Sequence, residues 1–228
     1  MSRIATNLQA VKSHICEVLP KTAKQVELLA VSKGQVAELI RDAYLAGQHC
    51  FAENYLQEAI EKMAQLRDLP IEWHFIGPVQ SNKTKPIAES FAWVQSVDRE
   101  KIARRLSESR PASMPPLNVC VQINISNEAT KSGVSPADAE ALCNVVAGLP
   151  GLRLRGLMTI GHPELNESDQ RRQFQSMKAL FDHLVAAGLQ IDTLSMGMSH
   201  DMDAAIFEGA TMVRIGTAIF GERQPGGH

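Results

Sequence analysis

The feature that most constrains the fold of this chain is a regular alternation of strand-like and helix-like segments. Eight short apolar or alternating stretches are each followed by a segment with helical periodicity. Eight such units within 228 residues predict an α/β protein with a (β/α)8 TIM barrel. An open doubly wound sheet is the alternative, because alternation alone does not show that the sheet closes. The predicted strands are Val26–Ser32, His49–Ala52, Glu72–Ile76, Ala92–Val97, Leu117–Ile125, Leu152–Thr159, Ile191–Met196 and Thr211–Ile215.

The predicted helices fill the intervals between these strands, and one more precedes the barrel. Residues 4–18 carry apolar side chains at helical spacing, which predicts an amphipathic N-terminal helix within about residues 1–20. We expect Asp98 to cap one barrel helix, and Ser135 followed by a proline to open another. The βα rhythm resumes directly after the proline-rich stretch 110–116, so we expect a single domain over residues 1–228. A disordered tail is expected over about residues 222–228.

Charge and composition exclude several classes of protein. The formal net charge is −2 with acids and bases interspersed, so no basic surface predicts nucleic acid or an anionic membrane as a partner. No apolar run reaches the ~18 residues of a membrane span, and residues 1–19 are unlike a signal peptide. The cysteines are scattered, and no His or Cys spacing is typical of a metal site. We therefore expect a cytoplasmic protein with no metal and with reduced, mostly buried thiols at Cys16, Cys50, Cys120 and Cys143.

Lys33 ends the first predicted strand, where a barrel of this kind opens. Partly dry surroundings would lower the pKa of its amine and make it available to attack an aldehyde. The alternative is that Lys33 is an ordinary strand-end lysine whose side chain reaches solvent.

Two loops at the end of the predicted barrel have groups suited to phosphate. The loop after strand seven, residues 195–201, has Ser199 in the position of a helix N-cap. The loop after strand eight contains Gly216, which permits close backbone approach, and Thr217, which offers a hydroxyl. Either loop alone could be an ordinary cap or turn, but barrels of this class bind phosphate at both positions.

A lysine opposite a phosphate cradle fits an aldehyde that carries a phosphate, and pyridoxal 5′-phosphate is the obvious candidate. Arg214 on the last strand could face the pyridine nitrogen and keep it unprotonated. A salt bridge to a carboxylate is the other common role for such an arginine.

The chain resembles the YggS/PROSC family of pyridoxal-phosphate homeostasis proteins, which is similar to the barrel domain of alanine racemase. The resemblance implies a fold-type III barrel with pyridoxal phosphate covalently bound to Lys33. It also implies phosphate contacts from Ser199, Gly216 and Thr217, with Arg214 near the ring nitrogen. Asn54 is implied near the ring face or phenolic oxygen, and Ser195 and Met196 belong to the same cofactor-binding set. The matching segments are LLAVSKG (Leu28–Gly34), FAENYLQE (Phe51–Glu58), EWHFIGPVQSNK (Glu72–Lys83), VQINISNEATKSG (Val121–Gly133), LRGLMTI (Leu154–Ile160) and LSMGMSHDMDAAIFEGATMVRIGTAIFG (Leu194–Gly221).

The predicted function is to hold pyridoxal phosphate and to buffer or deliver it, in support of vitamin B6 and amino-acid homeostasis. A racemase needs a base on each face of the bound substrate, and neither Tyr44 nor Tyr55 is well placed to be the second. Only about a dozen residues follow the last predicted strand, too few for the second domain that completes alanine racemases. A weak racemase and a cofactor-free Schiff-base aldolase are the alternatives.

Other expectations concern partners and the remaining polar residues. We expect a monomer whose partners are pyridoxal phosphate and the apo-enzymes that receive it. Lys131 could relay the cofactor, although a solvated loop lysine is the simpler interpretation. His74 on strand three is expected to be a hydrogen-bonded barrel residue.

Overall fold

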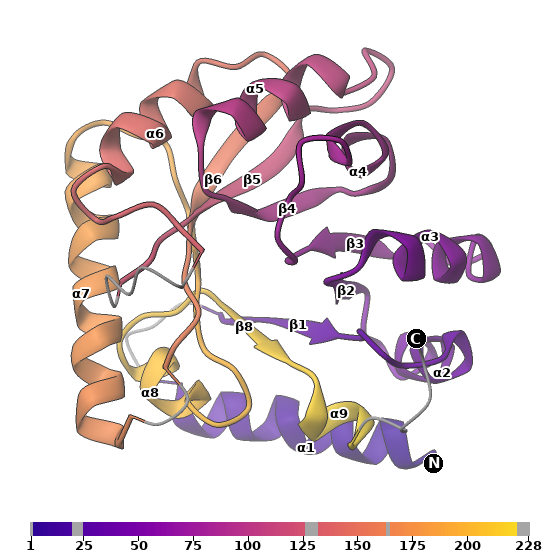
Figure 1. Cartoon of the computed structure of the whole chain (residues 1–228). Coiled ribbons are helices and arrows are strands. Elements are labelled where there is room, and N and C mark those ends of the chain that lie inside the picture. The colour runs from indigo at the N-terminus through magenta and orange to yellow at the C-terminus, as the bar shows by residue number, and fades with distance from the viewer. Residues whose placement is uncertain (1, 20–24, 126–131, 163–164, 223–228) are drawn as a thin grey trace.

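A closed barrel of parallel strands lies at the centre of the molecule, with helices around it (Figure 1). The computed structural model describes residues 2–19, 25–125, 132–162 and 165–222. Each strand pairs in parallel with the next, and the last returns to the first through pairs such as Leu28–Val213. The prediction of a closed barrel is therefore confirmed, and the open sheet is wrong. In order around the barrel, the described strands are β1 (Glu27–Val31), β2 (Cys50–Glu53), β3 (Glu72–Phe75), β4 (Trp93–Val97), β5 (Leu117–Gln122), β6 (Leu152–Met158), β7 (Thr193–Ser195) and β8 (Met212–Ile215).

Helices follow each strand, and one helix precedes the barrel as predicted. The main hydrophobic core lies between the strands and the helices around them, and the strand side chains that face the helices contribute to it. Side chains of alternate strand residues, such as Leu29, Ala52 and Met212, form separate smaller clusters. The helices of the described residues are α1 (Arg3–Val18), α2 (Ala37–Leu45), α3 (Leu56–Gln65), α4 (Thr84–Ser90), α5 (Glu100–Ser109), α6 (Ala139–Ala147), α7 (Glu167–Ala186), α8 (Met202–Phe207) and α9 (Thr217–Phe220).

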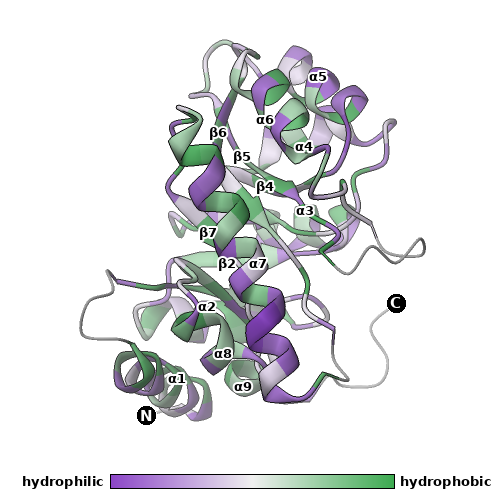
Figure 2. Ribbon diagram, turned by 90° about the vertical axis from the view of Figure 1, so that its left-hand side faces the viewer, coloured by the Kyte–Doolittle hydropathy of each residue, from purple (hydrophilic) through white to green (hydrophobic). Residues whose placement is uncertain are grey.

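The N-terminal helix α1 is amphipathic and covers one side of the barrel. Its buried side chains, Ile4, Leu8, Val11 and Ile15, recur every three or four residues and so form one face. The Ser2 hydroxyl accepts a hydrogen bond from the Ala5 backbone N–H at 3.3 Å and caps the helix. This face packs on α2, α8 and α9, and Figure 1 shows α1 running beside the last two. The mixed hydropathy of α1 and α7 along their lengths is visible in Figure 2.

The predicted helix starts at Asp98 and Ser135 are wrong. Helix α5 begins at Glu100 with Arg99 as its N-cap, so Asp98 lies one residue too early to cap it. The Asp98 carboxylate instead accepts a hydrogen bond from the Arg99 guanidinium at 2.6 Å. Helix α6 begins at Ala139, because Ser135 opens a separate turn before it: the Asp138 backbone N–H donates to the Ser135 carbonyl at 3.1 Å and to the Ser135 hydroxyl at 3.2 Å, so Ser135 caps this turn and not the helix.

The two ends of the barrel carry different residues. The barrel floor is the end where the strands begin, with Glu27, Cys50 and Glu72 as first residues. The barrel mouth is the end where they finish, next to Lys33 and Asn54. Within the described ranges, no helix is both long and apolar enough to cross a membrane. Lys131 and the predicted tail beyond residue 222 lie outside the described residues.

Candidate cofactor site at the barrel mouth

A cavity of about 250 Å³ opens at the barrel mouth. Its lining brings together six of the eight predicted site residues: Lys33, Asn54, Ser199, Arg214, Gly216 and Thr217. The other lining residues are mostly apolar and include Val31, Ile76, Met158, Ile160 and Met198. His200 also lines the cavity. A pocket with one apolar wall and a few convergent polar groups is typical of a small-molecule site.

Lys33 lies in the turn that follows β1, and the buried ammonium group of Lys62 holds this turn in place. The Lys62 ammonium on α3 donates to the Ser32 carbonyl at 2.7 Å, to the Glu53 carboxylate at 2.7 Å and to the Glu58 carboxylate at 2.5 Å. The Glu58 carboxylate also accepts from the Gly34 backbone N–H at 2.6 Å. Residues on both sides of Lys33 are thus tied to α3.

The partner of Lys62 is a fully buried carboxylate, Glu53. Burial raises the pKa of the Glu53 carboxyl, although the nearby Lys62 ammonium and the Ser32 hydroxyl oppose this rise. Ser32 donates its hydroxyl to Glu53 at 2.6 Å. Removing Lys62 would leave the buried Glu53 carboxylate without its counter-charge, which is costly. We therefore expect the ion pair between Lys62 and Glu53 to hold the loop around Lys33 in place.

The Arg214 side chain extends from β8 to the lining of the cavity, and Arg214 is only 4% exposed. Its guanidinium donates to the Ser195 hydroxyl at 2.9 Å and to the Thr159 carbonyl at 2.7 Å. Burial lowers the pKa of Arg214 to about 10, so the group is still a cation at neutral pH. None of the carboxylates in the described residues forms a salt bridge with it. The arrangement is a fixed positive charge that faces the cavity.

Ser195 and Met196 lie outside the lining of the cavity, unlike the other predicted residues. Both are fully buried. Ser195 sits beneath Arg214 and donates its hydroxyl to the Gln95 side-chain oxygen at 2.7 Å. Met196 packs in the hydrophobic core. Ser195 therefore orients Arg214, whereas Met196 contributes packing.

The two predicted phosphate loops are next to each other at the mouth, but Ser199 is not a helix N-cap. Helix α8 begins at Met202 with Asp201 as its cap, because the Asp201 carboxylate accepts from the Met198 backbone N–H at 2.5 Å and closes a turn first. Ser199 is in that turn, with its side chain exposed to the cavity. Thr217 opens the short helix α9 after Gly216, a helix that the sequence did not predict.

Gly216 allows a close approach where β8 passes β1. A Cβ atom there would lie 3.1 Å from the Val31 carbonyl oxygen and 3.4 Å from the Val31 Cβ. A side chain would therefore need a shift of a few tenths of an ångström between the end of β1 and the last loop.

The chemistry of the lining fits pyridoxal phosphate. The side-chain oxygen of Asn54 is buried at the cavity, and no donor among the described residues reaches it. A buried polar atom of this kind indicates a missing partner, such as a ligand. Val31, Ile76 and Met158 offer an apolar surface for a planar ring, while Ser199 and Thr217 offer hydroxyl donors for a phosphate.

Comparison with known proteins agrees with this geometry. Residues 2–224 match the sequence model of the family described as alanine racemase, N-terminal domain, which sets the class of the protein. The chain is 56% identical to the pyridoxal phosphate homeostasis protein of Pseudomonas aeruginosa, over 99% of this chain and 98% of that protein. It is 49% identical to the protein of that name from Escherichia coli K12, over 98% of each. The chain belongs to the family of pyridoxal phosphate homeostasis proteins.

Solved structures show the same barrel. PipY from Synechococcus elongatus PCC7942 is 38% identical, with a TM-score of 0.87 for its structure without pyridoxal phosphate and 0.85 with it bound. Both matches cover 96% of this chain and 100% of that one. Alanine racemase from Corynebacterium glutamicum is 20% identical with a TM-score of 0.72, over 99% of this chain and 62% of its own, and shares the fold.

Proposed function

We propose that this protein binds pyridoxal phosphate at the barrel mouth, with Lys33 as its covalent anchor. The observation that carries the proposal is one cavity lined by an amine, a permanent cation and the two phosphate loops. Pyridoxal phosphate supplies an aldehyde that reacts reversibly with amines. The PipY relative with pyridoxal phosphate bound supports the same ligand here.

Each polar residue has a separate role in this proposal. Lys33 forms a Schiff base with the aldehyde carbon, and the Lys62 contacts hold its loop in place. Ser199, Gly216 and Thr217 donate hydrogen bonds to the phosphate from side chains and backbone. Arg214 faces the ring nitrogen and keeps it unprotonated, which weakens the ring as an electron sink. Asn54 contacts the phenolic oxygen or the ring face.

We infer that the protein carries or buffers pyridoxal phosphate in the cytoplasm as a monomer, rather than turning over a substrate. The names of its relatives favour homeostasis. Neither Tyr44 nor Tyr55 lines the cavity, so the tyrosines supply no second base there. The Tyr44 ring contacts His49 at 4.8 Å, and Tyr55 is 61% exposed next to Asn54. A mouth open to solvent suits transfer to apo-enzymes.

Titration with pyridoxal phosphate, followed by visible absorption, tests the anchor. We expect a yellow band in the wild type and in Lys101→Ala, an exposed lysine on α5, but not in Lys33→Ala. A wild type that stays colourless would contradict the proposal. The loaded wild type should also leave L-alanine unracemised over hours, and robust racemisation that Lys33→Ala abolishes would establish an enzyme instead.

A further inference from the structure

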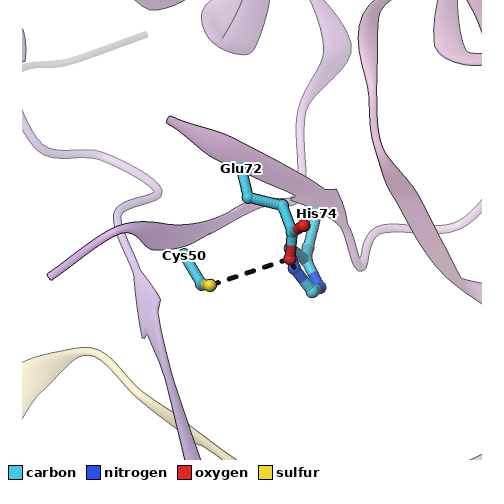
Figure 3. A group of neighbouring side chains, drawn as sticks. All are labelled: Cys50, Glu72 and His74. Carbon is cyan, nitrogen blue, oxygen red and sulfur yellow. Dashed lines mark hydrogen bonds and ion pairs between the residues drawn. The ribbon is translucent and has the colours of Figure 1, made fainter. Parts of the chain in front are cut away.

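A second group of reactive side chains lies at the barrel floor, at the opposite end from Lys33. Cys50 and Glu72 are the first residues of β2 and β3 and are directly paired in register. His74 is two residues further along β3, so its side chain is on the same face as that of Glu72. Figure 3 shows the three side chains converging from these two strands.

The distances between the ligand atoms are close to those of a metal site. The Cys50 thiol sulfur lies 3.7 Å from the Glu72 carboxylate oxygen, which lies 3.0 Å from His74 Nε2. All three atoms lie within 4.8 Å of one another. Zinc bonds of about 2.0–2.3 Å in a tetrahedron separate the ligands by roughly 3.3–3.8 Å. Small side-chain rotations would therefore complete the geometry.

The chemical types of the ligands favour a borderline transition metal over magnesium or calcium. A thiolate and an imidazole bind Zn²⁺ well, whereas hard cations prefer oxygen ligands alone. One thiolate and one carboxylate would balance the two positive charges of the ion. Glu27 adds a further carboxylate, which accepts a hydrogen bond from the Cys50 thiol at 3.2 Å.

Two carboxylates beside Cys50 also favour a cation. Those of Glu27 and Glu72 lie 3.2 and 3.7 Å from the Cys50 sulfur. Two of the three ligands are accessible: the Glu72 side chain is 44% exposed, and Cys50 lines a cavity of about 760 Å³.

The surroundings of His74 have the features of an outer coordination shell. Its ring is stacked on Trp93 at 5.0 Å and is fully buried, so its orientation is fixed. Its Nδ1 atom lies 2.9 Å from the Gln95 amide nitrogen. Metal binding at Nε2 places the proton on Nδ1, and Gln95 would then have to turn its amide to present oxygen to His74 and its NH2 group to the Ser195 hydroxyl, which now donates to the Gln95 oxygen.

We propose that Cys50, Glu72 and His74 form a binding site for a Zn²⁺-class cation at the barrel floor, with water at the fourth position. The site lies at the other end of the barrel from the cofactor cavity and shares no lining residue with it, although Gln95 and Ser195 link His74 to Arg214. Without a cation, the three groups form a hydrogen-bonded cluster, and the experiment must distinguish these two states.

Equilibrium dialysis of the reduced full-length protein against Zn²⁺, with bound zinc measured by mass spectrometry, tests the site. We expect one zinc per chain in the wild type and in Cys16→Ser, which changes an exposed cysteine outside the cluster. Cys50→Ser and Glu72→Gln should weaken zinc binding at least ~10-fold, the least that disturbing a coordination shell costs. Thermal unfolding of each variant confirms that it is folded.

Cobalt and magnesium provide independent readouts. Co²⁺ should give a thiolate charge-transfer band in the wild type that is absent from Cys50→Ser, and excess Mg²⁺ should not displace zinc. Zinc binding that Cys50→Ser and Glu72→Gln leave unchanged would overturn the proposal. So would the absence of stoichiometric zinc, loss of zinc in Cys16→Ser, or equal competition by Mg²⁺. Loading with pyridoxal phosphate is scored separately, so neither result decides the other.

Discussion

Arg214 illustrates how single residues prepare the barrel mouth. It is a buried cation that lacks a salt bridge within the described part of the chain and is held by two neutral oxygens, those of Ser195 and Thr159. Burial of a charge is costly unless hydrogen bonds compensate it, so each of these two hydrogen bonds is expected to stabilise the folded protein. Ser195 also links Arg214 to Gln95, which contacts His74 and connects the mouth to the barrel floor.

At this scale we predict the effect of Ser195→Ala. The substitution removes a hydrogen bond to a charged group and should lower the free energy of unfolding by about 1.5–3 kcal/mol. Urea unfolding measures the change. Ser176→Ala, on an exposed face of α7, is the control and should stay within about 0.5 kcal/mol of the wild type. Equal stability of the Ser195 variant and the wild type would contradict the role given to this serine.

At the scale of elements, α3 supports the turn after β1. The Lys62 ammonium contacts Ser32, Glu53 and Glu58, and thereby joins β1, β2 and α3 beneath Lys33. These contacts are more buried than the other ion pairs of the described ranges, with side-chain exposures of 6% for Lys62 and 0% for Glu53. We therefore expect α3 to hold the loop that carries Lys33 rigidly in place.

Lys62→Met should therefore destabilise the protein by about 3–5 kcal/mol, because it leaves Glu53 charged and unpaired. The double variant Glu53→Gln with Lys62→Met should lose less, since no buried charge remains. Chemical unfolding measures both. Lys178→Met, which breaks an exposed pair with Asp182, should cost only about 0.5 kcal/mol. A double variant less stable than the single one would show that the pair is not the cause.

The sequence predicts the elements better than their ends. All eight strands are readable because buried parallel strands are short apolar runs, and Lys33 and Arg214 follow from the rule that barrel sites lie at strand ends. The wrong helix starts at Asp98, Ser135 and Ser199 depend on local hydrogen bonds that compete with capping. The Lys62 contacts and the floor cluster join residues of different elements, which local spacing cannot reveal.

At the scale of the whole molecule, close packing protects the interior thiols. Cys120 and Cys143 are fully buried, while Cys16 is exposed on α1. Burial raises the pKa of both interior thiols, and that of Cys143 reaches about 12. They stay protonated near pH 8, and only the thiolate reacts readily with alkylating agents.

Iodoacetamide at pH 8 should accordingly label Cys16 first in the folded protein. Cys120 and Cys143 should react only after unfolding, as peptide mass spectrometry over a time course can show. Stability should also fall as the pH rises above about 9, where these thiols ionise in the unfolded chain but not in the folded one. Labelling of Cys120 or Cys143 as fast as Cys16 would mean that the barrel opens far more often than its packing implies.

The most direct test of the central claim is borohydride reduction of the pyridoxal phosphate-loaded protein, with peptide mapping of the product. Reduction makes the bond to the anchoring amine permanent, so the modified lysine can be identified by mass. We expect a single phosphopyridoxyl group on the peptide that contains Lys33, and none on that peptide in Lys33→Ala. Modification spread over exposed lysines such as Lys101, or absent from Lys33, would contradict Lys33 as the covalent anchor.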